Sequence, residues 1–169
     1  MSAAMLSRED VLEILEEVKD PEVPVLSVVE LGIVRDVEVS QDVVTIRITP
    51  TYSGCPAMRV IEEDIRAALA LHGVATIRLE TVYAPALTTD WLSDEAKRKL
   101  EAYGIAPPGP APNESLVSLI RAPSRLECPN CPYCHSRNTE LRSEFGSTAC
   151  NAIGYCHSCM QPFEIFKVL

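Results

Sequence analysis

Two Cys-x-x-Cys motifs constrain the fold of this 169-residue sequence more than any other feature. Cys131 and Cys134 form the first motif, Cys156 and Cys159 form the second, and the 21 residues 135–155 separate them. Two residues between cysteines let the backbone turn so that both thiolates face one point, and two such turns can hold Zn²⁺ tetrahedrally at about 2.3 Å. A segment of about 40 residues buries too little apolar surface to fold alone. We therefore expect metal binding to supply folding free energy here.

The residues between and after these motifs have the alternation of short strands. Leu141, Ser143 and Phe145 alternate with charged residues, and 163–167 is a further run with apolar residues. This pattern predicts three strands around one metal ion, so the C-terminal segment is expected to be a metal-stabilised three-stranded β ribbon.

Two further cysteines leave the ligand set open. Cys128 extends the first motif to the opening spacing of a ferredoxin-type iron–sulfur run, but Asn138 occupies the position of the fourth cysteine. We favour a structural Zn²⁺ on the four cysteines of the two motifs. An iron–sulfur cluster, or a zinc ligand set that includes Cys128, stays as an alternative. Cys150 is additional in every version, and we expect a small buried hydrophobe there rather than a ligand.

The first hundred residues predict a different architecture. The expected elements, in order, are a helix after a cap at 7–10, strands over 33–39 and 43–49, a helix from 55–56 to 73, a strand over 77–82 and a helix over 93–103. The two strands that come first form a hairpin whose buried face carries Val44, Ile46 and Ile48. The apolar stripe expected on the second helix is Val60, Ile61, Ile65, Ala68 and Leu69. The order α-β-β-α-β-α predicts a small α+β domain with a mixed sheet.

A proline-rich stretch separates the two patterns. Residues 107–112 read Pro-Pro-Gly-Pro-Ala-Pro, a composition typical of an extended, semi-rigid linker. We therefore expect a first domain over 1–106, a linker over 107–125 and the ribbon over 126–169.

Composition excludes several function classes. The formal net charge is −9 and no basic cluster occurs, which argues against a nucleic-acid partner. Apolar runs are too short to cross a membrane, and the N-terminus has no targeting pattern, so we expect a cytoplasmic protein. Seven cysteines, an odd number, fit a secreted disulfide scaffold badly. Motifs of the common hydrolases and phosphate-binding loops are missing, so independent enzyme activity is not expected.

Cys55 is the isolated cysteine of the first domain. It precedes Pro56 at the expected N-cap of the second helix, where free amides and the helix dipole stabilise a thiolate. Asp20 and Glu22 lie in an acidic turn that could pack alongside, and sulfur beside carboxylates would suit iron held transiently. The alternative is a capping cysteine with a structural role only.

Several motifs resemble known families. Asp20-Pro21-Glu22-Val23-Pro24, Glu30-Leu31-Gly32-Ile33-Val34 and Thr51-Tyr52-Ser53-Gly54-Cys55-Pro56 resemble the iron–sulfur assembly domain of SufT and of cytosolic cluster-targeting factors. The run from Phe145 to Cys150, with the second Cys-x-x-Cys motif and Pro162-Phe163-Glu164, is similar to the phenylacetate-degradation family PaaD, also called PaaJ. Together the two resemblances cover almost the whole chain.

The resemblance implies an accessory or maturation factor of the multicomponent phenylacetyl-CoA epoxidase of aerobic phenylacetate catabolism. It implies that Cys55, Asp20 and Glu22 transfer iron or an iron–sulfur cluster to the oxygenase or reductase subunits, and that the two Cys-x-x-Cys motifs form the ribbon site. A non-catalytic structural subunit and an iron–sulfur electron carrier stay as alternative functions. A homodimer is left open.

Overall fold

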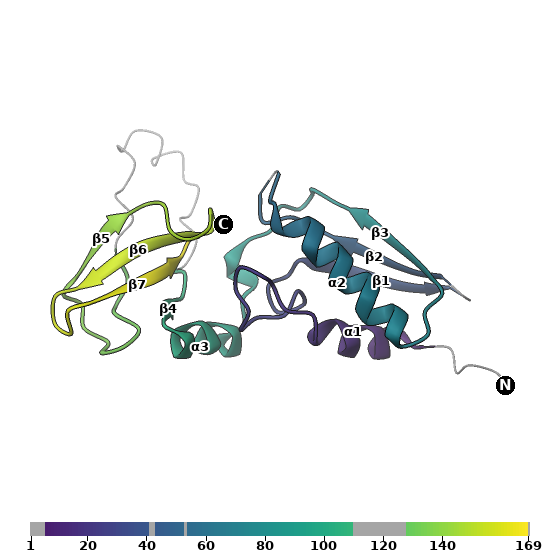
Figure 1. Cartoon of the computed structure of the whole chain (residues 1–169), viewed down its shortest axis with the longest axis horizontal. Helices are drawn as coiled ribbons and strands as arrows, with labels where there is room; N and C mark the ends of the chain where they lie inside the picture. Colours follow the sequence, from purple (N-terminus) through teal and green to yellow (C-terminus); the bar gives the residue numbers. More distant parts are fainter. Residues whose placement is uncertain (1–5, 41–42, 53, 110–127, 169) are drawn as a thin grey trace. The chain divides into compact units, whose positions relative to one another are not determined.

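The computed structural model describes residues 6–40, 43–52, 54–109 and 128–168. The chain forms two compact units (Figure 1). The first contains residues up to Leu87 together with Trp91–Ala96, and the second contains Thr88–Asp90 and the residues from Lys97 onward. Each unit is described by itself below.

The first unit begins with α1, Arg8–Glu16. The Ser7 side chain accepts a hydrogen bond from the Asp10 N–H, and the Asp10 carboxylate accepts one from the Ser7 N–H. This capping box satisfies two N–H groups and fixes the start of the helix, as the sequence predicts. Val11, Ile14 and Leu15 form its buried face.

A three-stranded mixed sheet follows, in the order β1-β2-β3. β1 (Val34–Ser40) and β2 (Val43–Ile48) form the predicted antiparallel hairpin, and β3 (Thr76–Thr81) pairs with β2 in parallel. The three β2 residues predicted to be buried are 0–4% exposed. Arg47, on the opposite face of β2, contacts carboxylates of β1 and β3. One face of the sheet is therefore apolar and the other carries charged pairs.

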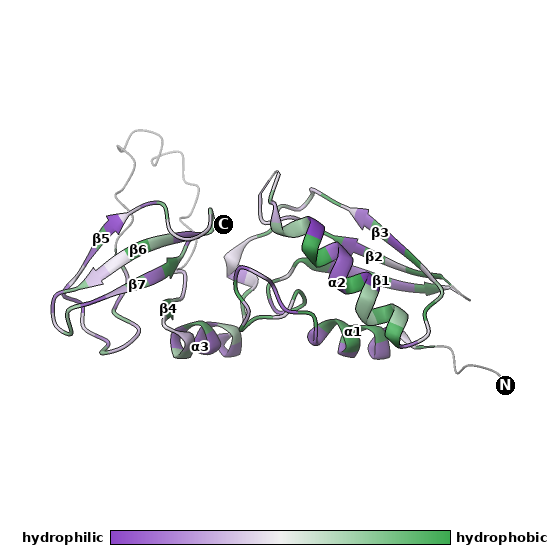
Figure 2. Ribbon diagram, viewed as in Figure 1, coloured by the Kyte–Doolittle hydropathy of each residue, from purple (hydrophilic) through white to green (hydrophobic). Residues whose placement is uncertain are grey.

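α2 (Ala57–Leu71) connects β2 to β3 and contacts α1 and β3. Its buried residues recur at every fourth position, and they are Ala57, Ile61, Ile65 and Leu69. Figure 2 shows the resulting alternation of apolar and polar residues along the helix. The sequence places Val60 in this stripe wrongly, because Val60 is 42% exposed. It is one position, about 100°, away from the row at 57, 61, 65 and 69.

The 3-10 helix η1 (Thr89–Trp91) and α3 (Asp94–Tyr103) complete the predicted order α-β-β-α-β-α. The division between the compact units falls within α3, between Ala96 and Lys97. No helix among the described residues is long and apolar enough to cross a membrane.

The second unit contains a four-stranded sheet in the order β4-β7-β6-β5. β5 (Thr139–Ser143), β6 (Asn151–Cys156) and β7 (Gln161–Phe166) are antiparallel neighbours and form the predicted three-stranded ribbon. The sequence did not indicate β4 (Ile105–Ala106), which adds to the edge of β7 in parallel. The core of this sheet consists of Ala106, Cys131, Ala152, Cys156, Phe163 and Ile165.

Most of the predicted linker, from residue 110 onward, lies outside the described residues. The expected domain boundaries at 106 and 126 stay a prediction, and the compact units divide the chain elsewhere, since residues 97–106 belong to the same unit as the ribbon.

Candidate metal centre

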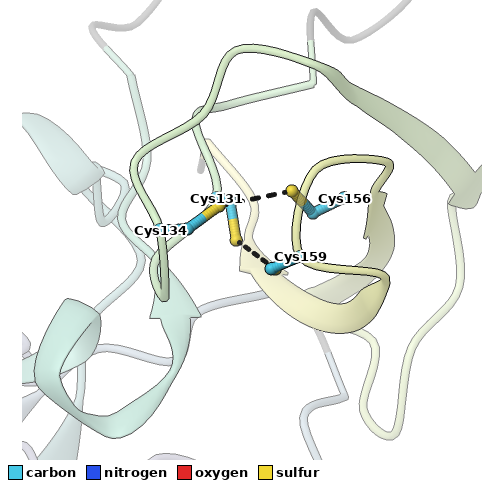
Figure 3. Close-up of side chains that lie close together, drawn as sticks. All are labelled: Cys131, Cys134, Cys156 and Cys159. Carbon is cyan, nitrogen blue, oxygen red and sulfur yellow. Dashed lines mark hydrogen bonds between the residues drawn. The ribbon is translucent and has the colours of Figure 1, made fainter.

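The two Cys-x-x-Cys motifs meet in the second unit (Figure 3). Cys131 and Cys134 lie in the turn before β5, Cys156 ends β6, and Cys159 lies in the turn before β7. The four Sγ atoms lie within 4.8 Å of one another. The Cys131–Cys159 and Cys134–Cys156 sulfur pairs are 3.6 and 3.5 Å apart, respectively. The pairing of β5 with β6, in which Thr139 lies opposite Cys156, therefore brings the second motif to the first.

This geometry fits a tetrahedral zinc site. A Zn–S bond of about 2.3 Å gives sulfur–sulfur distances of about 3.8 Å along a tetrahedron edge, close to the two short pairs here. A disulfide would require about 2.05 Å, and all four cysteines are free thiols. Four thiolate ligands leave no open coordination position, which is the arrangement of a structural rather than a catalytic zinc ion.

Backbone amides prepare one of these thiols for the metal. The N–H groups of Cys159 and Ser158 point at the Cys156 sulfur and lower the pKa of that thiol to about 6. Burial, followed by the neighbouring cysteines, raises the pKa of Cys159 to about 12. Because a metal binds thiolates, these two cysteines differ in how readily they become ligands.

Both turns use a left-handed residue directly after their second cysteine. His135 has φ 57° and Met160 has φ 61°, at a position where glycine is the least strained residue. His135 Nδ1 lies 3.2 Å from the Glu101 carboxylate, and His157 Nε2 lies 3.4 Å from Glu140. Each imidazole therefore pairs with a carboxylate beside the metal centre.

Cys128 and Cys150 are outside the four-cysteine group found among the described residues. Cys128 is half-buried against the ribbon core, and burial raises the pKa of its thiol. Cys150 is buried, and its carbonyl accepts a hydrogen bond from the Lys167 N–H. The four-cysteine group contains both cysteines of each motif. It leaves out Cys128, which the iron–sulfur alternative needs as a ligand.

Cys55 lies in the turn that leads into α2. The sequence indicates Cys55 as the N-cap of this helix, but in the structure the N-cap is Pro56, so Cys55 lies one position before the cap. Its N–H donates to the Tyr52 carbonyl, and its own carbonyl accepts from the Met58 N–H. The residue is only 9% exposed. The turn thus holds Cys55 as a buried residue directly before the first turn of α2.

Asp20 shapes the acidic turn from inside. One carboxylate oxygen, Oδ1, accepts hydrogen bonds from the Glu22 and Val23 N–H groups, at 2.7 and 2.8 Å, respectively. Asp20 is 5% exposed, and this burial raises the pKa of its carboxyl above 3.8, while the two hydrogen bonds act in the opposite direction. Glu22 is half-buried. Asp20 therefore has a structural role in the turn, whatever further role it has.

Within the described ranges, Cys55, Asp20 and Glu22 do not form a group of three side chains at metal-binding distance. Sequence reasoning missed Glu101 and Ala106, which precede the proline-rich stretch in the sequence. Glu101 contacts His135 beside the metal centre, and Ala106 belongs to the ribbon core. A lone glutamate in a polar helix and a two-residue strand carry no periodic signal that could have identified them.

Comparisons with known proteins agree with both halves of the architecture. Residues 8–79 match the family described as "Iron-sulfur cluster assembly protein", and residues 117–167 match the "PaaD zinc beta ribbon domain". The crystal structure of a domain of unknown function, DUF59, from Bacillus anthracis is 30% identical with a TM-score of 0.52. That match covers 55% of this chain and 90% of the domain.

Two relatives extend these matches. An Escherichia coli (strain K12) protein, named as one of the subunits of a "Putative 1,2-phenylacetyl-CoA epoxidase", is 40% identical over 161 residues, which are 95% of this chain and 92% of that protein. The Porphyromonas gingivalis (strain ATCC BAA-308 / W83) protein named "Fe-S protein maturation auxiliary factor" is 35% identical over 96 residues, 56% of this chain and 90% of that protein. These similarities support an accessory role connected with iron–sulfur proteins. With such identity over nearly the full length of both chains, the protein belongs to the PaaD family, as an iron–sulfur cluster assembly domain followed by a zinc beta ribbon.

Proposed function

We propose that this chain is a maturation factor for a multicomponent phenylacetyl-CoA epoxidase, delivering iron or an iron–sulfur cluster to its oxygenase or reductase subunits. One observation carries the proposal: a single chain joins the assembly domain to the PaaD ribbon, and a full-length relative is named as an epoxidase subunit. The assembly domain provides the transfer chemistry, and the ribbon provides a rigid module for docking.

In this proposal the two cysteine sites have different tasks. The ribbon cysteines would hold Zn²⁺, which supplies folding free energy to the module. Iron or a cluster is the cargo, and Cys55 is its ligand in the first unit. Because Cys55 has no second and third ligand close by among the described residues, the client protein must complete the coordination. Such a site favours release over storage.

Asp20 and Glu22 would act together in the acidic turn that follows α1. The Asp20 carboxylate fixes the backbone of the turn through its two hydrogen bonds. Glu22, which is less buried, is the carboxylate in this turn that is better placed to meet an incoming cation.

The test is to express the epoxidase components together with Cys55→Ser and with Cys128→Ser as the matched control. Cys128 is a half-buried thiol outside the four-cysteine group, so its loss should leave delivery intact. We expect the epoxidase from the Cys55→Ser strain to contain several-fold less iron or acid-labile sulfide. Full metal loading of both client components in that strain would refute the proposal.

The name of the full-length relative favours a second candidate, a structural subunit that stays bound to the oxygenase. In that case the chain copurifies with the oxygenase at a fixed stoichiometry, and the mature epoxidase loses activity when the chain is stripped off. A maturation factor is not needed once the client holds its metal. The mature epoxidase should then stay active after the chain is stripped off.

A further inference from the structure

Strand β4, which follows α3, is part of the ribbon's own sheet and core. β4 pairs in parallel with β7, through Ile105 opposite Glu164 and Ala106 opposite Ile165. Ala106 is fully buried and belongs to the same apolar cluster as two of the metal-site cysteines, Cys131 and Cys156. The packing of this segment therefore depends on the position of the cysteines that the metal holds.

A second contact joins the segment to the first cysteine turn. Gly104 ends α3 with φ +92°, and a Cβ atom at this position would lie 2.7 Å from the Tyr133 hydroxyl. Tyr133 is located between Cys131 and Cys134. Only glycine permits both the left-handed backbone and this close approach to the tyrosine.

A third contact lies one helical turn earlier in α3. Glu101 Oε1 is 3.2 Å from Nδ1 of His135, which directly follows Cys134, and the contact is an ion pair when the imidazole is protonated. A left-handed histidine is more strained than glycine at the same position. His135 thus links the turn to α3 at a position where glycine would make the turn itself easier to form.

We propose that occupancy of the four-cysteine site controls whether residues 97–106 are folded. Metal binding fixes the first cysteine turn, and Tyr133 and His135 then hold the end of α3 while β4 completes the sheet. Loss of the metal releases the turn, and with it the three contacts that order the segment. The number of residues of α3 that are folded therefore depends on the metal.

Amide hydrogen exchange on the full chain tests this proposal. The zinc-bound protein, the chelator-treated protein and the chelated protein with zinc restored are compared peptide by peptide. We expect residues 97–106 to lose at least about tenfold in protection on chelation, together with β6 and β7, and to regain it with zinc. The β2 strand of the first unit, Val43–Ile48, should be unchanged and is the internal reference.

Two matched variants separate the contact from general destabilisation. His135→Gly and Met160→Gly each relieve one left-handed residue after a cysteine, but only His135→Gly removes the contact with Glu101. With zinc bound, we expect exchange in 97–104 to be about two- to fivefold faster in His135→Gly than in Met160→Gly, the range of a partly exposed ion pair. Glu101→Gln, which keeps the side-chain shape, should reproduce a smaller part of this increase.

The proposal is overturned if residues 97–106 keep their protection in the chelated protein while the β6 and β7 peptides lose theirs. It is equally overturned if the two glycine variants exchange alike in 97–104. Neither result depends on which client the chain serves, so the maturation proposal can fail without affecting this one.

Discussion

The two cysteine sites of this protein differ in how many metal ligands the fold brings together. The ribbon brings four sulfurs from two turns within 4.8 Å, which is a full ligand set. In the assembly domain, Cys55 is 9% exposed and belongs to no group of three or more metal-binding side chains among the described residues. A complete set favours permanent binding, whereas a single sulfur needs a second molecule. Under the proposed function, this difference separates a structural metal in the ribbon from a cargo metal at Cys55.

The largest effect should come from breaking the complete site. Cys156→Ser removes one of the buried ligands, and structural zinc contributes about 10–16 kcal/mol of folding free energy in small zinc modules. We expect the second unit to unfold while the first stays folded. Trp91, the single tryptophan, lies in the first unit, so its fluorescence should be unchanged while circular dichroism loses the ribbon signal. A simultaneous loss of both signals would show that the units fold as one.

The converse substitution breaks the first unit only. Ile65→Ala opens a cavity under α2, at a side chain that is 0% exposed, and should cost about 2–5 kcal/mol. Urea unfolding followed by Trp91 fluorescence measures this loss. Zinc content per chain, determined in the folded range, should equal that of the wild type. Reduced zinc content would contradict the independence of the two sites.

A smaller effect is expected in the acidic turn. Asp20→Ala removes the acceptor of two backbone N–H groups and should destabilise the first unit by about 1–3 kcal/mol. Asp20→Asn keeps an oxygen acceptor at the same place and is the matched control. If the two variants unfold at the same urea concentration, the two hydrogen bonds do not stabilise the turn.

The stability of the Asp20→Asn variant should also differ from that of the wild type in its dependence on pH. Because burial raises the pKa of Asp20 in the folded state above 3.8, the folded chain holds this proton more tightly than the unfolded chain. The contribution of Asp20 to stability is therefore greatest at acidic pH, and it falls as the pH rises from about 3.8 through the raised value. Asparagine does not titrate, so the stability of the Asp20→Asn variant relative to wild type should increase as the pH rises through that range. A difference independent of pH would contradict the raised pKa.

The sequence predicted those elements whose signals are local. The capping box at Ser7, the alternation of the β1–β2 hairpin and the spacing of the two cysteine motifs depend on residues a few positions apart, and all three are present. Val60 was misplaced because an apolar residue beside the buried row of a helix looks the same in sequence as one within it. β4 was missed because two residues have no periodicity and their partner strand lies far along the chain.

The candidate sites show the same division. The four ribbon ligands could be predicted because the chemistry of zinc fixes their spacing. The contact of His135 with Glu101 could not be predicted, because it depends on the parallel pairing of β4 with β7, two strands that are far apart in the sequence. For Cys55 the sequence identified the right turn but placed the thiol one residue too close to the helix.

The pairing of β4 with β7 also has a kinetic meaning. The β5–β6 and β6–β7 pairs connect neighbouring strands through turns, so little loop-closure entropy is lost when they form. The pairing of Ile105 with Glu164 joins residues that are far apart in the sequence. Such contacts form late in folding. We therefore expect the hairpins to close first around the cysteines, with β4 as the last strand to join the sheet.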